Sequence, residues 1–183
     1  MKTIGRMTTG ILAVALAMAL HSSQARAQTP ESVTVTVSGA SGHLSSGTCP
    51  KGTGNCFLFT VAGTVQKSIG GALSGGALLL SFSSETDNAI AAPANGNCFP
   101  TQGSGSITSK NGKSALNFDV QGLECNTQSG VTCLTGPLNF AITPGTGNFA
   151  TASGAGTFSA ESLSCLGAGS ADVQITMQGV ILK

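Results

Sequence analysis

Residues Ser104–Gln121 read SGSITSKNGKSALNFDVQ and contain the clearest β-hairpin signal in the chain. Apolar side chains occupy every second position from Leu116 to Val120, which is typical of a strand with one buried face. The dipeptide Asn111-Gly112 precedes this segment and favours a two-residue type I′ turn, because both residues tolerate a positive φ. The stretch therefore predicts two antiparallel strands joined at Asn111-Gly112.

This hairpin also predicts a disulfide. A turn centred between Asn111 and Gly112 places Cys98 opposite Cys125 on the paired strand. With a two-residue loop this pair occupies a hydrogen-bonded position, whose Cα atoms lie about 5.5 Å apart. Such a separation is within disulfide reach.

The cysteine count is even, which is typical of a disulfide framework in an oxidising compartment. Six cysteines allow about 15 pairings. A Cys49–Cys56 bridge would close the loop between them, and Cys133 and Cys165 then remain. A metal site is the alternative, but the chain has no C-x-x-C pair. The disulfide candidates are Cys49, Cys56, Cys98, Cys125, Cys133 and Cys165.

Short strands with turn signals between them cover most of the chain and predict an all-β domain. Glycines inside strands favour strong curvature, so we expect an antiparallel β-barrel of about eight to nine strands, with a β-sandwich as the alternative. The predicted strands are Val33–Ser38, Phe57–Gln66, Ala77–Ser84, Ser104–Ser109, Leu116–Gln121, Leu138–Thr143, Gly147–Thr151, Gly156–Leu163 and Asp172–Met177.

The N-terminus has the pattern of a secretory signal peptide. Lys2 and Arg6 precede the apolar run Ile11–Leu20, and Ala25-Arg26-Ala27 provides small residues at a cleavage site. The run is shorter than the roughly 20 residues that span a bilayer. We therefore expect residues 1–27 to be removed, leaving a single disulfide-bonded domain at 28–183 that is secreted to the periplasm or the extracellular space.

The expected mature chain is poor in charge. It has five lysines, no arginine and seven acids, a formal net charge of −2, with one histidine and neither Trp nor Tyr. Without arginine or net positive charge, nucleic-acid binding is disfavoured. A single histidine disfavours a His-ligated metal centre. The missing Trp and Tyr disfavour an outer-membrane barrel, whose strands carry aromatic girdles.

Residues 142–158 read ITPGTGNFATASGAGTF and contain the pattern G-T-G-x-F-x-x-A-x-G. This element resembles one in the allene oxide cyclase and dirigent barrels and in secreted bacterial β proteins. The resemblance implies an eight-stranded antiparallel barrel with an apolar interior, but it carries no catalytic residue to this chain. From the residues themselves, we interpret Gly145, Gly147, Phe149 and Gly154 as a structural turn motif, in which the glycines permit tight turns and Phe149 enters the core.

The sequence predicts no catalytic residue, cofactor site or metal site. His43 lies in a Gly/Ser-rich segment without an evident acid partner. Two carboxylate pairs are candidates for glycoside hydrolysis, Glu85/Asp87 and Asp119/Glu124. Candidate Ca²⁺ ligands are Glu85, Asp87 and Asn88. For each of these groups a solvated charge is the simpler interpretation.

Three functions remain open. The first is a secreted, non-catalytic barrel with a structural or binding role toward a neutral small molecule or surface partner. The second is a barrel enzyme or a carrier of a small apolar ligand, as the resemblance allows. The third is a surface adhesin or matrix protein that assembles through strand edges. An enclosed cavity lined by Phe and Leu would favour the second, and a filled interior the first.

Overall fold

The computed structural model describes residues 30–41, 45–50, 54–68, 73–91, 97–126, 133–162 and 172–183. The expected signal peptide 1–27, His43 and Cys165 lie outside these ranges. The elements are β1 Pro30–Ser41, β2 Ser45–Thr48, β3 Asn55–Ser68, β4 Ala77–Glu85, β5 Ile90–Ala91, β6 Asn97–Thr108, β7 Ala115–Asn126, β8 Cys133–Thr146, the 3₁₀ turn η1 Gly147–Phe149, β9 Ser153–Ser162 and β10 Asp172–Leu182.

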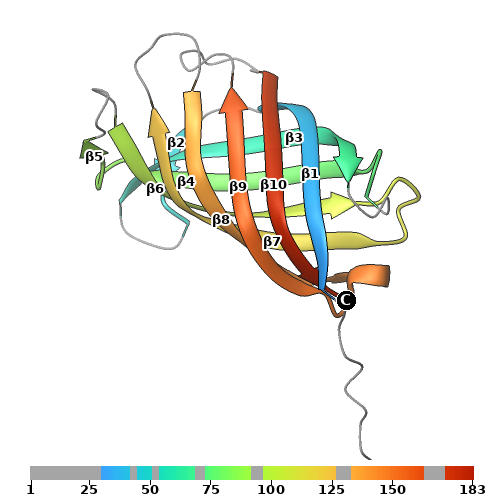
Figure 1. Ribbon diagram of the computed structural model, residues 1–183. Coiled ribbons are helices and arrows are strands. Elements are labelled where there is room, and N and C mark those ends of the chain that lie inside the picture. Colours follow the sequence, from blue (N-terminus) through green and yellow to red (C-terminus); the bar gives the residue numbers. More distant parts are fainter. Residues whose placement is uncertain are drawn as a thin grey trace, which may run out of the picture.

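Eight of the strands close into an antiparallel barrel (Figure 1), which confirms the predicted fold class. The order is β1-β10-β9-β8-β7-β6-β4-β3, and β3 pairs back to β1. Each ring strand therefore neighbours the next ring strand along the chain, an up-and-down arrangement. The two short strands lie outside the ring: β2 pairs with β3 and β5 pairs with β6. No helix in the described ranges has the length and apolar character needed to cross a bilayer.

The alternating apolar residues face the barrel interior, as their period predicts. Phenylalanine rings fill this interior beside glycines on neighbouring strands. A Cβ added at Gly105 would lie 2.4 Å from the Phe118 ring, and one added at Gly156 would lie 2.7 Å from the Phe140 ring. Large side chains thus occupy the room that glycine leaves. The core includes Val35, Val37, Val61, Val65, Leu78, Leu80, Ile107, Leu116, Phe118, Val120, Leu138, Phe140, Ile142, Phe158, Val173, Ile175 and Met177.

The β6–β7 hairpin has the predicted register, but its predicted turn is wrong. Ser109 N donates to Ser114 O at 2.8 Å and Gly112 N donates to Ser109 O at 2.8 Å. The loop is therefore Lys110–Lys113, and its first turn is centred on Lys110 and Asn111. The Asn111 Oδ1 atom accepts from Lys113 N at 3.0 Å and closes the longer loop.

Cys98 nevertheless faces Cys125, because the longer loop has the same centre as the predicted one. The added loop residues shift the pair from a hydrogen-bonded to a non-hydrogen-bonded position, where Cα atoms lie closer. Their Cα atoms are 3.9 Å apart, and the disulfide forms. The Cys49–Cys56 disulfide also forms as predicted. A third bridge between Cys133 and Cys165 cannot be described, because Cys165 is outside the described ranges.

The predicted strand Gly147–Thr151 is wrong. The chain forms η1 there, with Ala150 N donating to Gly147 O at 3.2 Å and Ala152 N donating to Phe149 O at 3.1 Å. Gly147 has a φ of +57°, which is incompatible with an extended strand. This turn lies at one end of the barrel (Figure 1), called here the η1 end. The opposite end carries both disulfides and is called the disulfide end.

Candidate functional site

The acidic residues considered as Ca²⁺ ligands accept hydrogen bonds from amide groups. Asp87 accepts from Asn55 N at 2.9 Å and from Asn55 Nδ2 at 3.2 Å. Asn88 Nδ2 donates to Glu85 Oε1 at 2.7 Å. Within the described part of the chain, no group of three or more His, Cys, Asp or Glu residues is arranged to hold a metal ion. The bonds between Asp87 and Asn55 join the turn after β4 to the start of β3.

Asp119 and Glu124 do not form a catalytic pair. They are five positions apart on β7, so their side chains point to opposite faces of the strand. Asp119 is exposed on the outer wall, whereas Glu124 is buried at 9 % exposure. Glycoside hydrolysis needs two carboxyl groups facing one bond, and this pair does not meet that condition.

Glu124 belongs to a buried polar cluster at the disulfide end. The Ser84 hydroxyl bonds the Glu124 carboxyl, and Ser84 Oγ lies 2.8 Å from Thr101 Oγ1. Ser84 is 1 % exposed and Thr101 is 4 % exposed. Burial raises the pKa of the Glu124 carboxyl above its ordinary value, and the hydrogen bonds with Ser84 and Thr101 offset part of this rise.

The Ser84 hydroxyl donates to the Glu124 carboxyl. The Thr101 hydroxyl donates to Phe99 O at 3.0 Å, so its proton is not available to Ser84. The cluster links β4, β6 and β7 inside the barrel.

Aromatic rings occupy the same end of the barrel. The rings of Phe59 and Phe82 are stacked with centroids 4.8 Å apart, and Phe57 meets Phe99 edge-on at 6.0 Å. Ser84 lies on the strand that carries Phe82 and is 1 % exposed. A substrate in solution therefore cannot reach its hydroxyl. The buried cluster is suited to holding strands together, not to nucleophilic chemistry.

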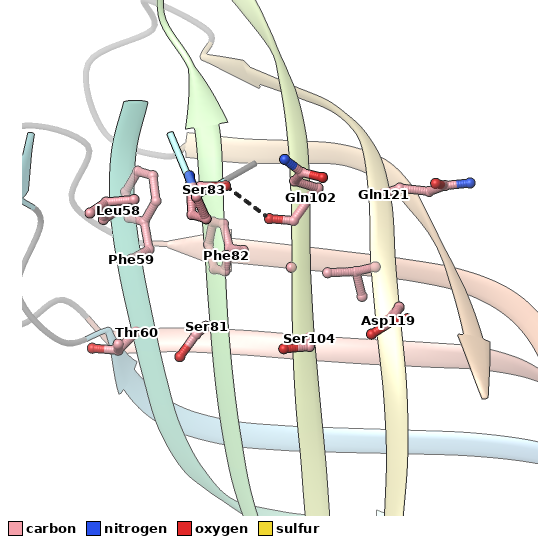
Figure 2. A pocket seen from close by; sticks show the side chains of 13 residues that line it. Leu58, Phe59, Thr60, Ser81, Phe82, Ser83, Gln102, Ser104, Asp119 and Gln121 are labelled. Atoms are coloured by element: carbon pink, nitrogen blue, oxygen red, sulfur yellow. Dashed lines mark hydrogen bonds between the residues drawn. The ribbon is translucent and has the colours of Figure 1, made fainter. Parts of the chain in front are cut away.

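A groove lies on the outer wall, across β3, β4, β6 and β7. Its volume is about 670 Å³. In Figure 2 eight of the labelled residues, seven of them polar, form two rows that cross the strands. The first row is Thr60, Ser81, Ser104 and Asp119, and the second is Leu58, Ser83, Gln102 and Gln121, each residue paired with the next. We call this cavity the polar groove, after the two rows. Its other lining residues are Pro50, Phe59, Phe82, Gly103 and Val120.

The polar groove presents hydroxyl and amide groups from a rigid wall. Ser81, Ser104, Gln102 and Gln121 are exposed. Asp119 is the single charged residue among the described residues that line it. Pro50 borders the groove next to Cys49, whose disulfide to Cys56 ties this segment to β3. The arrangement can bind a neutral group through side-chain hydrogen bonds.

The second row continues around the barrel. Gln121 pairs with Asn139, which pairs with Thr157, and Thr157 pairs with Gln178. All of these residues are uncharged, and Thr157 and Gln178 are exposed on the far wall. The far wall thus has similar side chains along the same row of paired positions, outside the polar groove.

The residues of the predicted turn motif pack against the barrel at the η1 end. A Cβ at Gly145 would lie 2.0 Å from Ala115 O, and one at Gly154 would lie 2.0 Å from Val180 O. A Cβ at Gly147 would lie 2.4 Å from Lys113 O. Phe149 is 1 % exposed, and Lys183 Nζ lies 5.3 Å from the centroid of its ring.

Comparison of the chain with protein-family models, with curated proteins and with solved structures gives no match.

The alternation in β7 contains a signal for Glu124 that the initial interpretation missed. Counting in steps of two from Leu116 through Phe118 and Val120 places residue 124 on the interior face. The polar groove has no such signal within one strand. It depends on the register of β3 with β4 and of β4 with β6, which no single strand specifies.

Proposed function

We propose that this chain is an exported, disulfide-bonded barrel that acts by binding and not by catalysis, with its ligand in the polar groove. Export is inferred from the signal-peptide pattern of residues 1–27. Two disulfides are consistent with an oxidising compartment.

The observation that carries this proposal is the paired arrangement of the two groove rows. Side chains on neighbouring strands of a sheet are held at nearly fixed spacing, because the backbones are hydrogen-bonded to each other. A ligand then meets hydroxyl and amide groups that need little reordering on binding. Such preorganisation lowers the entropic cost of association.

The barrel interior favours the binding proposal over a carrier of an apolar ligand. Leu80, Phe118, Phe140 and Phe158 are each at most 2 % exposed and fill the space between the walls. The closed ring also pairs both edges of each of its strands over much of their length, which leaves little open edge for assembly as a matrix.

Binding to the groove is tested by amide NMR spectra of residues 28–183 with a panel of neutral glycans, acidic glycans and unstructured peptides. Ser104→Arg places a long side chain in the groove from an exposed position, and Thr157→Arg places one on the far wall as the matched control. We expect a panel member to shift amides around Ser81 and Ser104, and Ser104→Arg alone to abolish this shift. A panel that shifts no groove amide contradicts the proposal.

A further inference from the structure

We propose that the ligand of the polar groove is a neutral, extended oligosaccharide of β-linked hexoses that lies across the strands. This inference rests on the binding function proposed above and names the class of ligand.

The charge of the groove selects against ionic ligands. Among its described lining residues there is no lysine, arginine or histidine, and Asp119 is the single acid. A phosphate, sulfate or uronate chain would therefore find no cation among these residues to pair with. A cationic chain would find one exposed carboxylate, and an ion pair with an exposed group contributes little binding free energy in water. A neutral ligand with many hydroxyl groups has no such penalty.

The hydrogen-bonding groups match those of a sugar. Gln102 and Gln121 each present an amide that both donates and accepts, and Ser81 and Ser104 each present a hydroxyl that does the same. Sugar hydroxyls also donate and accept. Leu58 and Pro50 give one end of the groove an apolar surface that suits the C–H face of a sugar ring.

The spacing of the rows matches a repeating chain. Neighbouring strands lie about 4.8 Å apart, so the first and last of the four strands are separated by about 14 Å. A pyranose unit in an extended β-linked chain has a length close to one strand spacing. Each sugar ring can then lie over one strand and between one pair of exposed row residues, such as Ser104 with Gln102 or Asp119 with Gln121.

A peptide strand is a poorer fit to the same surface. Peptides that bind sheets add to an open strand edge through backbone hydrogen bonds. The groove crosses β4 and β6 where both are paired on each side, so their backbone groups are already used. Its apolar lining side chains that face outward are confined to the Leu58 end, which leaves no series of pockets for alternate peptide side chains.

The test measures binding of cellohexaose to residues 28–183 by calorimetry and by amide shifts, with hexagalacturonate as the charged comparison. We expect cellohexaose to shift amides of β4, β6 and β7 around the groove, and hexagalacturonate to leave them unchanged. Gln102→Ala and Gln121→Ala are each expected to lower the affinity about fivefold, the effect of losing one or two hydrogen bonds. Gln178→Ala removes the same amide from the far wall and should leave the affinity unchanged.

Two negative results separate this inference from the function it rests on. If peptides or acidic glycans shift the groove amides and cellohexaose does not, the ligand class is wrong and the groove remains a binding site. If no probe shifts the groove amides, both proposals fail. An equal loss of affinity for Gln178→Ala and Gln102→Ala also overturns the inference, because it moves the contact away from the groove.

Discussion

Replacing Gly147 with alanine is expected to lower the melting temperature by about 10 °C through two separable effects. Gly147 has a φ of +57°, where a non-glycine residue costs about 1–2 kcal/mol. Its new Cβ would also lie 2.4 Å from both Lys113 O and Ser114 Oγ. Forcing atoms into a packed site costs about 1–3 kcal/mol. A total of about 2–5 kcal/mol, at about 2–4 °C per kcal/mol for a domain of this size, gives the expected shift.

Two control variants divide this total. Gly112 has a φ of +69°, but a Cβ there would meet nothing within 4 Å, so Gly112→Ala measures the backbone cost alone. Gly145 has no positive φ, and its Cβ would lie 2.0 Å from Ala115 O, so Gly145→Ala measures the steric cost. We expect a shift of about 3–5 °C for Gly112→Ala and the largest shift for Gly147→Ala. Alanine also stiffens the unfolded chain, which offsets each cost by about 0.4–1 kcal/mol.

The assay is thermal unfolding of residues 28–183, followed by circular dichroism with the disulfides intact. Equal melting temperatures for Gly147→Ala and Gly112→Ala would refute the steric part of the reasoning. A melting temperature for Gly147→Ala that matches the parent chain, together with lost cellohexaose binding, would show that η1 is a functional loop and not a structural turn.

Three further predictions concern the interior and the disulfides. Burial raises the pKa of Glu124, so folding favours its protonated form. The free energy of unfolding of the parent chain, relative to that of Glu124→Gln, should therefore fall as the pH rises above the ordinary carboxyl range. Urea unfolding from about pH 4 to pH 8 measures this difference. A difference that stays constant with pH contradicts the prediction. Phe118→Ala should cost about 3–5 kcal/mol, because a fully buried ring is lost, and a urea midpoint within error of the parent would contradict it. Replacing the Cys98–Cys125 bridge by two alanines should cost about 3.5 kcal/mol, against about 2.4 kcal/mol for Cys49–Cys56, because their sequence separations are 27 and 7; the reverse order would contradict the loop-entropy account.

The hairpin shows how far local sequence reasoning extends. The register between Cys98 and Cys125 was predictable because it depends on the centre of the loop and not on its length. The turn type was not, because Asn111 accepts hydrogen bonds from Ser109 Oγ and Lys113 N that make the longer loop favourable. The second local error is at η1, where Gly147 has a positive φ and the chain forms a turn in place of the predicted strand Gly147–Thr151.

The sequence by itself determined where the eight ring strands lie and which of their faces is apolar, because alternation is a property of one strand. It also determined the pairing of both described disulfides, since each encloses one short segment or one hairpin. The tertiary structure alone decided that β3 closes onto β1, that Glu124 meets Ser84, and that the two polar rows align into a groove. Each of these needs the register of several strand pairs at once. That register is selected by how the Phe rings and glycines pack inside the closed barrel.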